Sequence, residues 1–344
     1  MKAEESLTQT DLLPTDLIME IFKRLPLKTL ARFLCVSKLW ASSLIRSRYF
    51  KKLFLAESLK RPGRLFFNIR RGKACCFYSS LQTQKPGKAS VATYHMTLPY
   101  PRDKFTIMSP SVHGLICHRT FSSLKIYNPS TRRSITLPEF HAERPWLDNH
   151  YLGYDPIEGD YKILCMTTGT NGLAQDVQVL TIGEGNQWRM IVDCPPPHSP
   201  TIPQICIEGV LYYGACTRRQ NGSKEHVIIC FDVRNYPGSV HLCVLEDAAK
   251  HEWSYKCFGL PSLAGFRNSF QVFCAIDETG EFVLAPRNLE APPFYVLYYD
   301  PEKKSMRRVG IEGITKFWQI GPYPRHQTRT IFIFPDQVEN LMFI

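Results

Sequence analysis

The sequence predicts an α+β chain built from two parts, a small N-terminal module of three helices and a larger all-β domain, most simply a β-propeller. Two observations predict the split. Apolar residues before residue 54 recur at helical spacing, whereas short strand-like runs broken by Gly and Pro follow after about residue 64. A third observation, the recurrence of tight turns about every fifty residues, favours a propeller.

The first helix is predicted from a wide apolar stripe. Leu17, Ile21 and Leu25 recur at intervals of four residues, and Ile18 and Phe22 widen the stripe. One face of this helix therefore needs an apolar partner.

Residues at the helix ends predict where the three helices begin and stop. Thr15 or Asp16 can cap the first helix, and Pro26 ends it. A second helix is expected at 28–33, and Ser37 can cap a third. The apolar residues of the third helix are Trp40, Leu44, Ile45, Leu53 and Phe54.

A module of about forty-five residues is at the lower limit for independent folding. Periodicity leaves two interpretations open. The module is a helical cap on the rest of the chain, or it is a docking module whose outer apolar residues are covered by a second protein.

The run L-P-x-D-L-I-x-E-I-x-x-R-L-P-x-K-x-L-x-R-F-x-x-V-S-K-x-W, which begins at Leu13, resembles the F-box in the form common in plant proteins, over residues 11–50. Phe22 stands where that family more often has Leu. The resemblance implies that the module binds a Skp-family adaptor and, through it, a cullin–RING ubiquitin ligase. It implies that the following residues divide between the module's core and the adaptor-binding surface: Leu13, Pro14, Leu17, Ile21, Leu25, Pro26, Leu30, Val36 and Trp40.

Length and composition fit this organisation. The 344 residues suffice for the module and one or two further domains, and 44% hydrophobic with 21% charged residues is typical of an ordered globular protein.

No apolar run reaches about eighteen residues, so no membrane span or membrane partner is expected. The N-terminus lacks a signal-peptide pattern, which predicts cytoplasm or nucleus. The twelve cysteines include no C-x-x-C pair, and we expect free thiols.

The positive charge is concentrated in one segment. Of the net charge of +11, residues 44–73 carry +9, and residues 74–344 carry only +1. A nearly neutral β domain is a poor nucleic-acid receptor. The basic segment is either a solvated helix face and linker or a contact for an acidic protein surface, such as a ligase subunit.

We expect an F-box at 8–53, a basic linker at 54–64 and a substrate-binding domain at 65–344.

The β domain is predicted from pairs of strand-like runs joined by tight turns. The strong pairs are 124–127 with 134–137, 177–180 with 188–191, 227–231 with 240–244, and 295–299 with 306–311. Weaker pairs are 74–81 with 91–97, and 331–334 with 341–344. Further strands precede the strong pairs, at 114–117, 150–153, 161–166, 209–213, 270–276 and 281–285.

Turn centres lie near residues 85, 128, 184, 234, 301 and 336. Spacing of about fifty residues suits four-stranded propeller blades of the kelch type. These features do not fix the number of blades, for which six is preferred to five, and the irregular intervals keep a pair of β-sandwiches as the alternative.

Short motifs of this region, among them Gly-Leu-Ile-Cys from Gly114 and Ile-Tyr-Asn-Pro-Ser-Thr-Arg-Arg from Ile126, resemble the F-box-associated domain of plant F-box proteins. The motifs are mainly structural. Tyr127, Trp188 and Tyr299 are expected to pack within blades, and three residues followed by Pro are expected to form turns: Asn128, Asp155 and Asp300.

No motif indicates catalysis or a cofactor. No G-x-S-x-G is present, and residues 86–89 and 183–185 fall short of phosphate-binding loops. His113, Cys117 and His118 come nearest to a metal-ligand set, but their spacing favours an ordinary strand. We expect no enzyme, cofactor or metal.

The predicted function is that of the substrate-recognition subunit of a cullin–RING ubiquitin ligase, which holds an unidentified target protein through the β domain. The candidate target-binding stretches are 141–149, 195–203 and 288–293. The alternative is a Skp-bound binding module, or a small-molecule or glycan receptor, without a ligase role.

Overall fold

The fold is described from a computed structural model. The described residues are 13–38, 40–71, 74–82, 89–99, 107–119, 123–140, 149–169, 171–183, 187–191, 198–218, 224–233, 240–243, 270–275, 279, 281–286, 294–300, 303–314 and 331–343. Within these ranges, no helix is long and apolar enough to cross a membrane.

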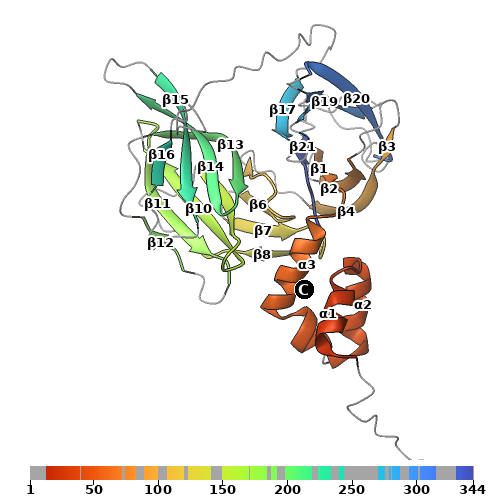
Figure 1. The fold of residues 1–344 in the computed structure, drawn as a ribbon. Coiled ribbons are helices and arrows are strands. Elements are labelled where there is room, and N and C mark those ends of the chain that lie inside the picture. Colours follow the sequence, from red (N-terminus) through yellow and green to blue (C-terminus); the bar gives the residue numbers. More distant parts are fainter. Residues whose placement is uncertain are drawn as a thin grey trace, which may run out of the picture.

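The N-terminal helices, red and orange in Figure 1, form a separate layer below the β domain. They are α1 (Thr15–Phe22), α2 (Leu27–Val36), the π-helix η1 (Trp40–Ile45) and α3 (Arg48–Ser58). The predicted three-helix module is therefore confirmed, and its ends differ from the prediction. The N-cap of α1 is Pro14, not Thr15 or Asp16, and Pro26 precedes α2 rather than ending α1.

The predicted third helix is in fact two segments. Ser47 interrupts it, because its side chain accepts a hydrogen bond from the backbone N–H of Phe50 at 3.1 Å and caps a new helix. This helix, α3, continues to Ser58, so the first part of the expected linker at 54–64 is helical. Phe54 and Leu55 are buried there.

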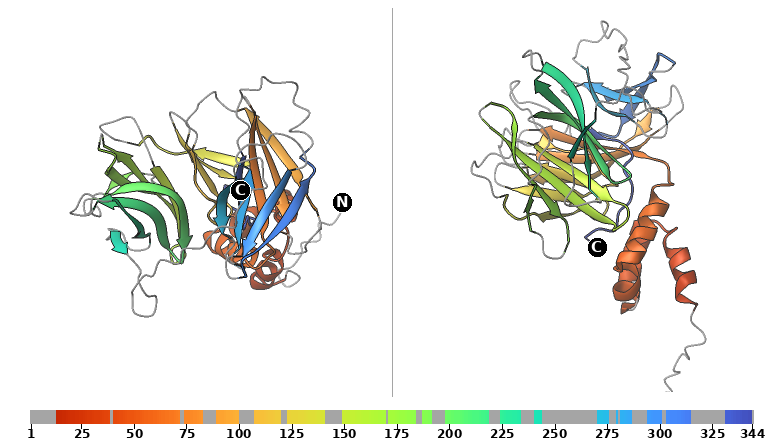
Figure 2. Two further views of the ribbon diagram at one scale, coloured as in Figure 1. Left: turned by 90° about the horizontal axis from the view of Figure 1, so that it is seen from above. Right: turned by 60° about the vertical axis from the view of Figure 1, so that its left-hand side comes forward.

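The β domain is a five-bladed propeller, since the described strands form five separate sheets arranged around a ring (Figures 1 and 2). Blade 1 contains β21 (Ile331–Phe334), β1 (Arg64–Arg71), β2 (Ala74–Leu81) and β4 (Thr93–Pro99). Blade 2 contains β5 (Ile107–Met108), β6 (Ile116–Arg119), β7 (Leu124–Asn128) and β8 (Arg133–Thr136). Blade 3 contains β9 (Asn149–Asp155), β10 (Asp160–Thr168), β11 (Ala174–Thr181) and β12 (Arg189–Met190).

Blade 4 contains β13 (Ser199–Ile207), β14 (Val210–Arg218), β15 (Lys224–Asp232) and β16 (Val240–Cys243). Blade 5 contains β17 (Phe270–Ala275), β18 (Phe282–Pro286), β19 (Phe294–Asp300) and β20 (Ser305–Glu312). The short strand β3 (Ser90–Val91) leaves blade 1 and pairs in parallel with β20. The four strong hairpins predicted from the sequence all form, as does the weaker pair of β2 with β4.

The preference for six blades is wrong because the two ends of the chain share one blade. The strand β21 pairs with β1 rather than with residues 341–344, which form no strand as far as Phe343. The first and last predicted turns therefore belong to a single blade. The kelch type of repeat stays a prediction.

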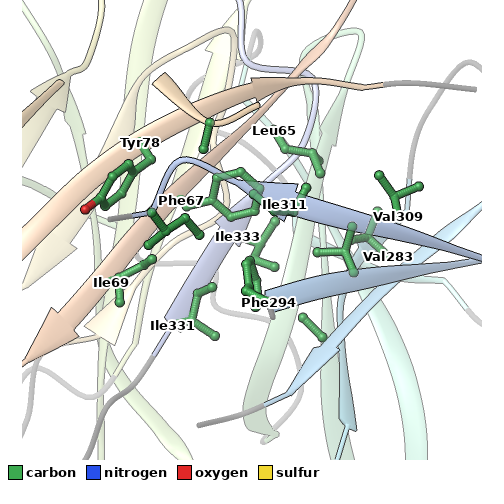
Figure 3. Close-up of a cluster of buried hydrophobic side chains, with 14 of the residues drawn as sticks. Leu65, Phe67, Ile69, Tyr78, Val283, Phe294, Val309, Ile311, Ile331 and Ile333 are labelled. Atoms are coloured by element: carbon green, nitrogen blue, oxygen red, sulfur yellow. The ribbon is translucent and has the colours of Figure 1, made fainter. Parts of the chain in front are cut away.

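Among the described residues, buried side chains that alternate along the strands fill four of the five gaps between neighbouring blades. The largest cluster joins blades 1 and 5, where Phe67 meets Phe294 edge to face at 5.9 Å between ring centroids (Figure 3). Further clusters lie between blades 1 and 2, 2 and 3, and 3 and 4. The cluster between blades 1 and 5 packs the last blade against the first.

The order of strands gives the propeller two different faces. The four main strands of each blade are antiparallel to their neighbours, so the first-to-second and third-to-fourth connections lie at one end; in blade 1, β21 ends and β1 begins at this end. The helices lie at this end, which we call the helix face (Figure 1). The connections between blades leave from the other end, the opposite face.

Candidate functional site

The exposed side of α1 is the candidate site. Leu17 and Ile21 are 51% and 49% exposed, and Leu13, just before the helix, is 58% exposed. Residues four apart lie on the same side of a helix, so these side chains form one apolar stripe. An unpaired stripe of this kind on an otherwise packed module is typical of a protein-binding surface.

The inner side of α1 holds the module together. Phe22, Phe33 and Trp40 form a triangle of rings with centroids 5.0, 5.2 and 5.5 Å apart. The two contacts of Trp40 are edge-on, and aromatic pairs of this kind add about 0.5–1.5 kcal/mol each beyond burial. Leu30 is fully buried beside them. The single stripe predicted for α1 is therefore split between core and surface.

The structure thus divides the residues that the sequence singled out. The exposed ones are Leu13, Pro14, Leu17, Ile21, Pro26 and Val36. Leu25 and Trp40 are partly buried against the core, and Leu30 has no exposed surface. The last three support the module from within in the free protein.

The module is fixed to the propeller through Arg61 and Glu339. The Arg61 guanidinium donates to Glu339 at 2.5 Å and to the backbone carbonyls of Lys23 and Leu25, both at 3.1 Å. Glu339 also accepts from the backbone N–H of Leu27 at 3.2 Å. Because α2 has no side-chain cap of its own, this carboxylate serves as its N-terminal partner.

A second attachment joins α3 to the turn between β9 and β10. Arg48 donates to the Asp160 carboxylate at 2.7 Å and to the Glu158 carbonyl at 2.6 Å, and Lys52 donates to the Ile157 carbonyl at 2.7 Å. Gly159 has a positive φ of 75°, and the Lys52 side chain occupies the space where a Cβ would lie. Part of the predicted basic segment therefore binds its own propeller.

The C-terminal segment 335–343, which we call the strap, crosses the helix face and contacts both parts. The side-chain amide of Asn340 donates to Tyr161 Oη at 2.7 Å and to the His113 carbonyl at 2.8 Å. Asn128 donates to the carbonyls of Asn340 and Met342 at 3.0 and 2.8 Å. Leu341 then enters the core of the helical module.

Sequence reasoning did not find Arg61, Glu339 and Asn340. Each acts across a separation of more than a hundred residues, for example 278 residues between Arg61 and Glu339. No local pattern carries such a pairing.

The candidate target-binding stretches mostly lie outside the described residues. The parts of these stretches that lie outside the described residues are 141–148, 195–197 and 288–293. The strands on either side of them end on the opposite face. Among the residues with described positions, no group of three His, Cys, Asp or Glu could hold a metal ion.

Comparison with known proteins agrees with both parts of the structure. The F-box domain model matches residues 11–52, and the model of the F-box associated beta propeller domain matches residues 64–236 and 235–338. The chain is similar to F-box protein At2g21930 of Arabidopsis thaliana, with 41% identity over 96% of this chain and 94% of the relative.

Two further relatives from Arabidopsis thaliana cover nearly the whole chain. Putative F-box protein At4g38870 is 41% identical over 97% of this chain and 88% of its own length. F-box protein DOR is 35% identical over 96% of this chain and 94% of its own length. With helical module, propeller and near full-length relatives in agreement, this chain belongs to the F-box proteins that carry an F-box-associated β-propeller domain.

Proposed function

We propose that this protein is the substrate-recognition subunit of a cullin–RING ubiquitin ligase. The observation that carries the proposal is the exposed stripe of Leu13, Leu17 and Ile21 on a module whose opposite side is packed and attached to the propeller. A Skp-family adaptor covers this stripe, and the family of the chain supports that choice of partner.

In this proposal the protein performs no bond chemistry. The propeller holds a target protein, and the adaptor connects the pair to the ligase in the cytoplasm or nucleus. Ubiquitin transfer is accelerated because the target lysine is held at high effective concentration near the charged conjugating enzyme. The target-binding region is the opposite face, where the connections between blades leave the described strands.

The proposal is tested by measuring binding of the purified protein to a Skp-family adaptor. Leu17→Asp and Ile21→Asp place a charge in the stripe without disturbing the buried side of α1, so each is expected to weaken binding at least a hundredfold. Met190→Asp is the matched control, because Met190 is an exposed apolar residue of β12 in the propeller. It is expected to bind like the wild type.

Unchanged binding by Leu17→Asp and Ile21→Asp would overturn the surface assignment. Adaptor binding without recruitment of the cullin would instead favour the second function class, a Skp-bound binding module without a ligase role.

A further inference from the structure

A cleft of about 610 Å³ lies between α3 and blade 3, at the junction of the two parts of the molecule. Residues 46–55 form one wall, and blade 3 with the strap forms the other. We call it the junction cleft. Its volume is in the range of about 300–1,000 Å³ that is typical of small-molecule sites. The proposed ligase function does not use it.

The junction cleft has an excess of positive charge. Arg46, Arg48, Lys51 and Lys52 line it, and Asp160 is the carboxylate among its lining residues. Arg48 pairs with Asp160, and Lys52 is bound to a backbone carbonyl. Arg46 and Lys51 have no ion-pair partner among the residues that the structure describes.

The two unpaired cations, Arg46 and Lys51, repel each other electrostatically. Burial lowers the pKa of Lys51, and repulsion from Arg46 lowers it further. A half-buried ammonium beside a guanidinium is stabilised when an anion enters between them. A negatively charged ligand in the cleft would therefore reduce the repulsion between Lys51 and Arg46.

The far wall contributes a neutral donor. Burial raises the pKa of Tyr154, and the nearby carboxylates of Asp155 and Asp160 raise it further. Tyr154 lines the cleft, and its hydroxyl stays protonated near neutral pH, so it keeps its hydrogen-bond donor.

We propose that the junction cleft binds a small polyanion that carries two or more phosphate groups. Guanidinium and ammonium donors together suit phosphate oxygens. A small molecule fits better than a nucleic acid, because residues 74–344 carry a net charge of only +1 and offer no extended basic track. A ligand here contacts α3 and blade 3 at once, and so strengthens the attachment of the helical module.

The test uses the full chain and inorganic tripolyphosphate as the probe, with calorimetric titration at physiological salt. Wild type is expected to show one saturable site, and the double variant Arg46→Gln with Lys51→Gln is expected to bind at least tenfold more weakly. Lys60→Gln is the matched control. It removes one positive charge just after α3, where Lys60 is exposed and outside the cleft, and it is expected to bind within twofold of wild type.

A second measurement separates ligand binding from folding. Without tripolyphosphate, Lys51→Gln is expected to unfold at the same or a higher temperature, because it removes the repulsion from Arg46. No saturable binding by wild type, or equal weakening by Lys60→Gln, would overturn the proposal. So would an acidic peptide that binds the cleft when tripolyphosphate does not.

Discussion

One buried and two half-buried histidines make the propeller sensitive to acid. Burial lowers the pKa of His113 to about 4, of His118 to about 4 and of His150 to about 3. Lys125 lowers the pKa of His118 further, and Arg119 does the same for His150. All three stay neutral in the folded protein near neutral pH, whereas in the unfolded chain each has a pKa of about 6.5.

This difference sets the direction of the pH dependence. As pH falls below about 6.5, the unfolded chain takes up protons that the folded protein does not bind, so the free energy of unfolding falls. We expect each histidine to remove about 1–2 kcal/mol between pH 7 and pH 5. Denaturant unfolding at a series of pH values measures the loss, and His150→Gln is expected to reduce the slope. A stability that is constant over this range would contradict the assignment.

Single residues show how far local sequence reasoning reaches. The turn roles predicted for Asn128, Asp155 and Asp300 are confirmed, because each carboxylate or amide oxygen accepts backbone N–H groups of the residues that follow. Each of these hydrogen bonds joins residues close in the sequence, so the sequence alone can predict it. The second role of Asn128, as an anchor for the strap, depends on residues more than two hundred positions away and leaves no local signal.

Among the elements, the strap does most to join the two parts. It has no regular secondary structure, and it is held by side chains from three sources: Arg61 on Glu339, Asn128 on the backbone at 340 and 342, and the helical core around Leu341. Gly114, with a positive φ of 83°, allows close passage, since a Cβ there would lie 2.4 Å from the Val338 carbonyl oxygen. The strap is therefore a structural element and not a loose terminus.

Substitution of Asn340 tests this role. Asn340→Ala leaves the part-buried His113 carbonyl and the buried Tyr161 hydroxyl without their donor, and we expect it to lower the free energy of unfolding by about 1–3 kcal/mol. Asn171→Ala is the control, because Asn171 is exposed and its side chain accepts a local bond from the Leu173 N–H. Denaturant unfolding of both variants provides the measurement. Equal small effects of the two substitutions would contradict a structural role for the strap.

Element prediction succeeded where pairing is local and failed where it is not. Hairpins such as β7–β8 and β19–β20 join strands that are adjacent in the sequence, and the turn residues between the strands predict them. The pairing of β21 with β1 places the first and last strands of the propeller in one blade. The turn spacing alone assigns these two ends of the sequence to two separate blades. The interruption at Ser47 was missed because apolar spacing continues through it.

At the scale of the whole molecule, the helical module, which we propose binds the adaptor, and the opposite face, which we propose binds the target, lie on opposite sides of the propeller. The helices are attached to the helix face through α3, Arg61 and the strap, and the blade connections leave from the opposite face. Figure 2 shows the helices projecting from one side of the propeller. The family resemblance predicted the two parts and the partner class, but the relative placement of the parts depends on long-range contacts.

The measurement that tests this account most directly is hydrogen–deuterium exchange of the full chain with and without a Skp-family adaptor. The account predicts slower exchange in α1 and at the C-terminal end of α2 near Val36, and no change in α3 or the strap. Protection of α3 and the strap, with α1 unchanged, would contradict the claim that the exposed side of α1 is the docking surface.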